Sequence, residues 1–143
     1  LGFGRDPERT PMQWDDSAHA GFSTAEPWLP VNHDYRRNNV ATQRASPDSL
    51  LNWYKALLEL RRLEPALQSG QLAWLASPAD VMAWTRMHEN RNIDILLNCG
   101  GRTRTMRLRG GTVSAGTHAA AGSRVPAGDY RLAPYEVLIV AQT

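Results

Sequence analysis

The spacing of hydrophobic and polar residues changes along the chain, and its last part alternates as β-strands do. From about Gly70, short apolar runs are separated by turn-forming residues, and alternate positions are apolar between Val81 and Met87. Several such runs at short intervals indicate a mainly β fold, an antiparallel β-sandwich. The expected strands are residues 71–76, 80–87, 92–99, 104–109, 128–132 and 135–142. The Ala- and Gly-rich segment 111–124 is expected to be a long loop with a weak strand.

One helix is expected before the strands. Ser46 is the predicted N-cap, Pro47 the first helical residue, and Pro65 the residue that stops the helix. Apolar side chains recur three and four positions apart between these limits, and they form a wide face that requires a partner surface. The sandwich, a second copy of the chain, or the loop "GFSTAEPWLPV" could each supply that surface.

The first region, Leu1 to about Ala45, has neither helical nor strand periodicity and contains many turn-forming residues. Loops of this length inside compact domains are normally functional or disordered. Eight apolar residues favour order because they are expected to be buried: Phe3, Met12, Trp14, Phe22, Trp28, Leu29, Val31 and Tyr35. We therefore predict a long, ordered, functional loop.

Composition excludes several classes of protein. The chain of 143 residues is 42% hydrophobic with a mean hydropathy of −0.45, and it contains no apolar run long enough for a membrane span. Its net charge of +2 is small and its arginines are dispersed, which disfavours nucleic-acid binding. The single cysteine, Cys99, excludes an intrachain disulfide and is expected to be buried in its strand, in a reduced, cytoplasmic protein. The start at Leu1, without an initiator Met, leads us to expect a piece of a longer protein.

No complete catalytic set is visible. A retaining glycosidase needs two carboxyl groups about 5 Å apart, and the loop acids Asp6, Glu8, Asp15 and Asp16 are too close in sequence to be expected to converge on one bond. They are interpreted as acids paired with nearby arginines or with solvent. The histidines lack metal-ligand spacing, and there is no nucleophile elbow or phosphate-binding loop. We therefore predict no catalytic residue, no metal and no cofactor in this chain.

Arg5 and Arg9 are the candidate binding residues. The planar fork of arginine suits pairs of oxygens on a polar ligand, and the faces of Trp14 and Trp28 can stack on a sugar ring, although buried tryptophan is commoner. From the residues alone, the alternative is that both arginines form ion pairs that brace the loop.

The stretch "RDPERTPMQWDDSAHAGFS" resembles a segment of the family-13 glycoside hydrolases, the α-amylase superfamily. The likeness is greatest to the oligo-1,6-glucosidase, α-glucosidase and trehalose-6-phosphate hydrolase group. It continues through "EPWLPVN", "NNVATQ", "DSLLNWYKALLELRR" and "APYEVLIV", and so covers essentially the whole chain.

The resemblance implies that residues 1–69 are the end of a catalytic (β/α)₈ barrel, namely the loop after strand 8 and helix 8. Residues 70–143 would then be the β-sandwich called domain C. Active sites of such barrels lie at the carboxyl ends of the strands, so the loop would start beside the substrate. Arg5 matches the family arginine that binds a hydroxyl of the non-reducing-end glucose, and Arg9 matches one nearer the next sugar. The family's nucleophile, acid/base and third carboxylate lie in segments that are not in this sequence, as do its calcium-binding loops.

The resemblance thus implies the C-terminal part of an exo-acting retaining α-glucosidase that cleaves α-linked gluco-oligosaccharides, with a barrel as missing partner and no activity alone. Two alternatives stay open. Trehalose synthases also carry Arg-Thr-Pro-Met-Gln-Trp, which keeps a transglycosylase parent possible. A freestanding carbohydrate-binding or interaction module would display two or more exposed coplanar aromatics on its sandwich, whereas Trp74 and Trp84 lie in apolar patterns and are expected to be buried.

Overall fold

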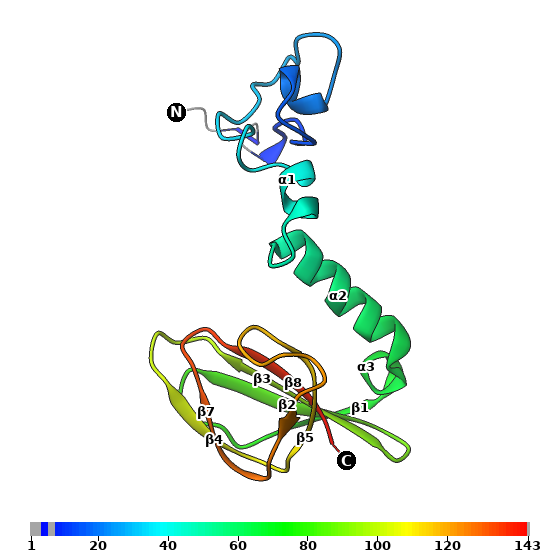
Figure 1. The fold of residues 1–143 in the computed structure, drawn as a ribbon, viewed down its shortest axis with the longest axis vertical. Helices are drawn as coiled ribbons and strands as arrows, with labels where there is room; N and C mark the ends of the chain where they lie inside the picture. The colour runs from blue at the N-terminus through cyan, green and yellow to red at the C-terminus, as the bar shows by residue number, and fades with distance from the viewer. Residues whose placement is uncertain (1–3, 6–7, 143) are drawn as a thin grey trace. The chain divides into compact units, whose positions relative to one another are not determined.

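The computed structural model describes residues 4–5 and 8–142 (Figure 1). The chain forms two compact units, Leu1–Ala56 and Leu57–Thr143, and the boundary between them falls within helix α2 (Leu50–Leu63). The first unit contains a short 3₁₀ helix, Ala18–Gly21, and helix α1 (Val40–Ala45). The second begins in the later part of α2, continues through helix α3 (Pro65–Ser69), and contains every strand found among the described residues.

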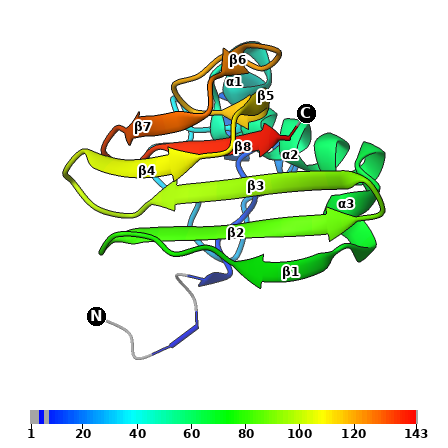
Figure 2. The same ribbon diagram turned by 90° about the horizontal axis from the view of Figure 1, so that it is seen from below.

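The second unit holds two antiparallel sheets. Their strands are β1 (Gln71–Trp74), β2 (Val81–His88), β3 (Arg91–Asn98), β4 (Arg104–Leu108), β5 (Gly111–Gly116), β6 (Arg124–Val125), β7 (Gly128–Leu132) and β8 (Val137–Ala141). Six strands form one sheet in the order β1-β2-β3-β8-β5-β6, and β4 pairs with β7 in the other. Figure 2 shows β1, β2, β3 and β8 side by side across the larger sheet. The predicted antiparallel sandwich is confirmed.

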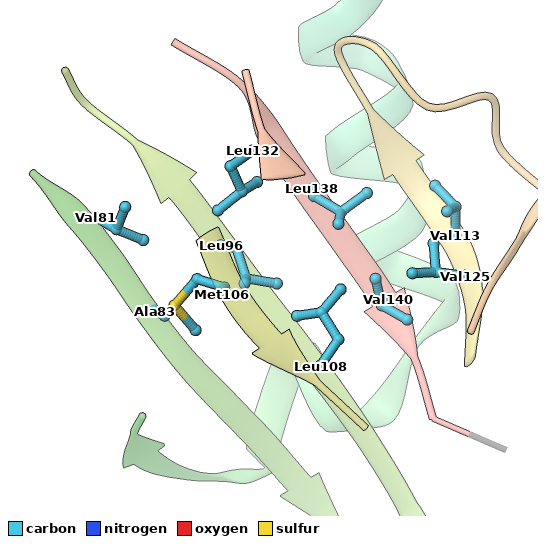
Figure 3. Packing of buried hydrophobic residues seen from close by; sticks show 10 residues of the cluster. All are labelled: Val81, Ala83, Leu96, Met106, Leu108, Val113, Val125, Leu132, Leu138 and Val140. Carbon is cyan, nitrogen blue, oxygen red and sulfur yellow. The ribbon is translucent and has the colours of Figure 1, made fainter. Parts of the chain in front are cut away.

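The core lies between the two sheets, and Figure 3 shows it from close by. Ten buried apolar residues form it: Val81, Ala83, Leu96, Met106, Leu108, Val113, Val125, Leu132, Leu138 and Val140. Alternation along β2 explains which side chains enter the core, because Val81 and Ala83 point inward and Met82 between them points outward. Leu96, near the middle of the larger sheet, is 0% exposed.

Part of segment 111–124 is more regular than the sequence suggested. Strand β5 pairs with β8 through Thr112 opposite Ala141 and Val113 opposite Val140, followed by an irregularity in register before Ala115. Ala and Gly have low strand propensity, so here pairing with a neighbouring strand overrides local preference. Gly111, at φ +147°, fits the start of this strand because a Cβ there would overlap the carbonyl oxygen of Ala141.

The expectation that Cys99 is buried is wrong, since its side chain is exposed. Strand β3 ends at Asn98, and that residue takes the buried position at the turn. The Asn98 amide donates to the carbonyl oxygens of Arg102 and Ala133 at 2.8 Å each, and its Oδ1 accepts from the Gly100 amide. The buried residue at this turn is therefore Asn98, which donates hydrogen bonds to carbonyl oxygens of the turn, and not Cys99.

The expected burial of two sandwich tryptophans is also wrong. Trp74 is 66% exposed and Trp84 is half-buried, because both lie on the side of the larger sheet that faces away from the core. Their ring centroids are 5.8 Å apart and their planes meet at 67°, an edge-to-face arrangement. Both strands were predicted, but which face the tryptophans occupy was not.

Helix α2 starts later than predicted. Ser49, not Ser46, caps it, since the Ser49 hydroxyl accepts from the Asn52 amide at 3.2 Å, while Ser46 ends α1. The helix ends at Leu63, and Glu64 has an extended backbone, as is usual for a residue before proline. No residue of α2 is buried in this chain. Self-association through its apolar face stays a prediction. None of the described helices is both long and apolar enough to cross a bilayer.

A buried polar contact joins β7 to the turn before β8. The Tyr130 hydroxyl donates to Glu136 Oε1 at 2.8 Å, and the Ala133 amide donates to Oε2 of the same carboxylate at 2.6 Å. Glu136 is itself buried. Burial and the hydrogen bond to Glu136 raise the pKa of Tyr130 to about 12.

This contact predicts a pH dependence of stability. The pKa of an unfolded tyrosine is about 10, so the contribution of Tyr130 is fully present below about pH 10 and is lost as pH rises toward 12. We expect the melting-temperature difference between the wild type and Tyr130→Phe to be constant up to about pH 9 and to narrow above pH 10. Tyr135→Phe, at an exposed position, is the control. A difference that widens with pH would contradict this account.

Candidate functional site

The two candidate arginines lie at the start of the first unit, and both are exposed. The backbone amide of Glu8, which lies between them in the sequence, donates to the Arg5 carbonyl oxygen at 3.1 Å. Within residues 4–5 and 8–142, no ion pair involves Arg5 or Arg9. Asp6 lies outside the described residues, so the proposed bracing partner next to Arg5 is not tested. Glu8 and Asp16 are exposed.

Asp15 shapes the loop. Its Oδ1 accepts from the backbone amide of Ser17 at 2.9 Å and from the Ser17 hydroxyl, and these bonds hold the pKa of the carboxyl below its ordinary value. The carboxylate also lies against Gly21, where a Cβ would come within 2.6 Å of it and where φ is +64°. His19 and Ala20, just before this glycine, share its left-handed conformation. Asp15 is therefore a loop-forming residue, and it forms no ion pair with an arginine in the part of the chain that the structure describes.

The motif Pro-Met-Gln-Trp is held against the start of helix α1. The first helical amides, of Val40 and Ala41, donate to the carbonyl oxygens of Gln13 and Trp14 at 2.9 Å each. Asn39 caps the same helix, since its Oδ1 accepts from the Thr42 amide at 2.8 Å. Amides at a helix start have no partner within the helix, so the motif satisfies two of them. Helix α1 was not predicted, although an Asn directly before Val-Ala is an N-cap signal.

A side-chain network fixes the same junction. The Gln13 amide donates to Asp34 Oδ1 at 3.0 Å and to the Asn38 carbonyl oxygen at 2.6 Å, and the Asn38 amide donates to Asp34 Oδ2 at 2.6 Å. The bonds from Asn38 and then Gln13 lower the pKa of Asp34. Asn39, which is buried, also donates to the Tyr35 carbonyl oxygen. Gln13, Asp34 and Asn39, which order the loop, were not among the residues predicted to be important there.

Of the eight apolar residues expected to be buried, Phe3 lies outside the described residues, and most of the others are not buried. Leu29 is buried, but Met12, Trp14 and Phe22 are exposed and Trp28 is 86% exposed. The segment is thus ordered by hydrogen bonds and has only a small apolar core. It presents arginines and aromatic rings at its surface, which are groups suited to binding hydroxyl-rich ligands. The described residues contain no group of three or more His, Cys, Asp or Glu placed to hold a metal.

This small core predicts where the chain is first cleaved. We expect limited trypsin digestion to cut first before Ser46, because few buried contacts protect that segment against local opening. The strands around Leu96 should resist, since their side chains fill the core. Digestion followed by mass spectrometry measures the order of cuts. First cuts inside Val81–His88 or Arg91–Asn98 would contradict the prediction.

Comparison with known proteins identifies relatives over most of the chain. Residues 2–70 match the α-amylase catalytic domain family. The glucan 1,6-α-glucosidase of Streptococcus pneumoniae is 36% identical over 108 residues, which is 76% of this chain and 20% of that protein. The α-glucosidase of Pediococcus pentosaceus is 44% identical over 93 residues, or 64% and 16%. The oligo-1,6-glucosidase of Bacillus cereus is 54% identical over 59 residues, or 41% and 11%.

Solved structures with a similar fold match nearly all of the chain. The trehalulose synthase MutB from Pseudomonas mesoacidophila MX-45 has a TM-score of 0.85 and 33% identity, covering 96% of this chain and 26% of its own. The isomaltulose synthase from Klebsiella sp. LX3 has a TM-score of 0.84 and 30% identity over the same shares. The chain therefore spans a fifth or less of the relatives named above and about a quarter of these structures.

Proposed function

Since residues 2–70 belong to the α-amylase family, we propose that the chain is the C-terminal part of an exo-acting retaining α-glucosidase. In this proposal the whole enzyme cleaves α-linked glucose from short oligosaccharides. The loop of residues 4–45 borders its substrate site, and the sandwich stabilises the barrel. The names of the sequence relatives, which are glucosidases, support this substrate class. A reducing, cytoplasmic setting is part of the proposal, and the exposed free thiol of Cys99 is compatible with it.

The observation that carries the proposal is the structure of the Arg-Thr-Pro-Met-Gln-Trp segment. Hydrogen bonds from Gln13 and Asn39 order the loop, yet its arginines and its Trp14 and Trp28 rings stay at the surface. A loop ordered by its own polar groups, with its aromatic residues exposed, is suited to lie against a ligand and another part of a protein.

The chemistry assigns this chain a binding role. Hydrolysis with retention requires one carboxylate to attack the anomeric carbon and form a covalent glucosyl-enzyme. A second carboxyl protonates the leaving oxygen and then activates water. We place both carboxyls outside this chain. Arg5 would donate to a hydroxyl of the terminal glucose and Arg9 would lie nearer the next sugar, so that the bond to be cleaved is held in line with the nucleophile.

A second candidate function is transfer of the glucosyl group to another sugar. Its support is that the structural neighbours are named trehalulose synthase and isomaltulose synthase. Transfer and hydrolysis share the glucosyl-enzyme and differ in the acceptor, so the same role for Arg5 serves both. Products formed from sucrose and from maltose by the whole enzyme would distinguish them. A freestanding binding module has weaker support, since the Trp74 and Trp84 rings are not coplanar.

The proposal predicts that the isolated chain has no glucosidase activity, because it lacks the pair of catalytic carboxyls. The purified chain is assayed with p-nitrophenyl α-glucoside. We expect no release of nitrophenol above that of a mock preparation. Turnover that persists through purification and disappears in Asp6→Asn or Glu8→Gln would overturn the proposal, because the chain would then carry its own catalytic acids.

A further inference from the structure

One segment of the second unit carries an excess of positive charge. Residues 102–131 contain six arginines and one acidic residue, Asp129, so their net charge is +5 with His118 counted as neutral. The whole chain has 16 basic and 14 acidic residues, which leaves ten basic and thirteen acidic residues elsewhere, a net charge of −3. Such an asymmetry within one chain indicates a region that attracts anions.

Only part of this positive charge is neutralised by carboxylates. Arg104 donates to Asp80 Oδ2 at 2.6 Å, and Arg109 donates to Asp94 Oδ1 at 2.9 Å. The other four arginines of the segment form no ion pair with any residue that the structure describes; they are Arg102, Arg107, Arg124 and Arg131. Their guanidinium groups are therefore left for other partners.

Two of the six arginines border one cleft of about 370 Å³. Arg109, which follows β4, and Arg124, in β6, line this cleft together with Gly110 and Ala127. Pairing of β5 with β6 brings the two stretches together, since Gly111 lies opposite Val125 (Figure 2). Small-molecule sites in proteins have volumes of about 300–1,000 Å³, so the cleft has the size of a site for a small ligand. We call it the Arg109–Arg124 cleft.

Arg109 is held in place by a buried carboxylate. The side chain of Asp94 is 5% exposed, whereas that of Arg109 is 52% exposed. Asp94 also lines a neighbouring cleft, together with Arg107. A guanidinium has five N–H donors, so its bond to Asp94 leaves donors of Arg109 for a ligand. Because the orientation of Arg109 is set before a ligand arrives, less side-chain entropy is lost on binding.

Two backbone amides also border the cleft. Gly110 and Ala127 lie outside the strands, and their amides take part in none of the turn and loop hydrogen bonds among the described residues. Gly110 has φ +84°, and a Cβ there would come within 2.8 Å of the Ala127 amide nitrogen. A larger residue would therefore be strained and would crowd that amide. Backbone amides that converge on a concave site are a common means of binding anions.

We propose that the Arg109–Arg124 cleft binds a phosphate group, either as inorganic phosphate or carried by a small sugar. Two guanidinium groups and two amides offer more donors than the two oxygens of a carboxylate can use. A phosphate group presents three terminal oxygens and a charge of about −1.5 to −2 at pH 7, and arginine forks bind such oxygens in pairs. The inference concerns residues of the second unit alone and does not rest on the proposed function.

A nucleic acid fits these residues less well. Single strands are bound by cations spaced along a groove and by aromatic rings on which bases stack, and the residues that line this cleft include no aromatic side chain. On the smaller sheet, Asp129 lies opposite Arg107. Its carboxylate would repel a phosphate backbone that ran from the cleft across that sheet. A single phosphate group in the cleft avoids this repulsion.

Calorimetric titration of the purified chain tests the proposal. The ligands are sodium phosphate, glucose 6-phosphate and glucose, at about pH 7.5 and constant ionic strength. We expect both phosphates to bind and glucose not to bind. Arg124→Gln should raise the Kd for both phosphates at least about tenfold, because it removes a hydrogen bond from a charged group. Arg124 is exposed and forms none of the described ion pairs, so the variant should keep its melting transition.

Arg131→Gln is the matched control. It removes the same charge from an exposed position of β7 that does not line the cleft. Its Kd values should stay within about twofold, because charges at a distance are screened by salt. Arg124→Lys should recover only part of the affinity, since lysine lacks the planar fork.

Two further readouts identify the ligand. A lower Kd for glucose 6-phosphate than for inorganic phosphate would assign a sugar phosphate, and an equal or higher one would assign the free anion. The second pKa of a phosphate monoester is about 6, so both Kd values should rise when the pH is lowered from about 7.5 to about 5.

The absence of saturable binding of either phosphate would overturn the proposal. An equal loss of affinity in Arg124→Gln and Arg131→Gln would also overturn it, because the attraction would then come from the basic surface as a whole. So would a single-stranded oligonucleotide that binds more tightly than glucose 6-phosphate and is weakened equally by both variants. Glucosidase activity is not a readout here, so failure of the proposed function would leave this inference standing.

Discussion

Replacing Leu96 with alanine is expected to lower the free energy of unfolding of the sandwich by about 2–5 kcal/mol. Leu96 is 0% exposed and belongs to the core cluster between the two sheets. The substitution removes buried methyl groups and leaves a cavity that the surrounding strands fill only in part. Domains of this size are stable by only about 5–15 kcal/mol, so a large share of the stability is lost.

Thermal unfolding followed by circular dichroism measures the effect. One kcal/mol shifts the melting temperature of a domain of 60–100 residues by roughly 4–8 °C, so we expect a fall of at least about 8 °C. Leu63→Ala removes the same atoms from an exposed position and should change the free energy of unfolding by less than about 0.5 kcal/mol. Equal effects of the two substitutions would show that the core has been placed wrongly.

The second large effect is expected at Arg5. Consider a chimera in which the oligo-1,6-glucosidase of Bacillus cereus is kept up to the start of its region aligned with this chain and is followed by residues 1–143. In this chimera, Arg5→Ala should lower kcat/KM for p-nitrophenyl α-glucoside about 10- to 150-fold. A hydrogen bond from a charged group contributes about 1.5–3 kcal/mol, and each 1.36 kcal/mol is a factor of ten in rate. Arg5→Lys should recover only part of this loss, because lysine keeps the charge and lacks the planar fork.

Arg36→Ala is the control for Arg5. Arg36 is also an exposed arginine of the first unit, and its guanidinium stacks on Tyr35 at 5.5 Å from the ring centroid. Its removal should leave kcat/KM within about twofold, because the proposal gives it no contact with substrate. Unchanged kinetics in Arg5→Ala would contradict a glucose-binding role for Arg5, and an equal loss in Arg36→Ala would indicate a general effect of charge.

Much of the fold could be predicted because strand alternation follows directly from burial of one face. The run from Val81 to Met87 is a clear case, and β2 extends one residue beyond it. Periodicity does not reveal what lies against the opposite face. Trp74 and Trp84 were expected to be buried because apolar side chains usually are, whereas the described residues leave them partly exposed. The segment that forms strand β5 was expected to be mostly loop, because its pairing with β8 is a long-range contact that local propensity does not report.

The loop was the least predictable part. Its sequence predicted order and a polar ligand, and the hydrogen bonds of Gln13, Asp34 and Asn39 agree with the predicted order. The sequence did not reveal that Gln13 and Asn39 order the loop. The partners of Gln13 lie 21 to 25 residues away along the chain, and Asn39 caps a helix that was not predicted. The roles of Arg5 and Arg9 depend on groups outside this chain, so neither its sequence nor its fold tests them.

If the chain is the C-terminal part of an α-glucosidase, it should complete the active site of a related enzyme from which that part has been removed. The oligo-1,6-glucosidase of Bacillus cereus, truncated at the start of the aligned region, is compared with the chimera in which residues 1–143 follow that point. Release of nitrophenol from p-nitrophenyl α-glucoside is measured for both proteins at equal concentration. We expect turnover by the chimera and none by the truncated protein. A chimera that is folded, by circular dichroism and a cooperative melting transition, but has no more turnover than the truncated protein would contradict it.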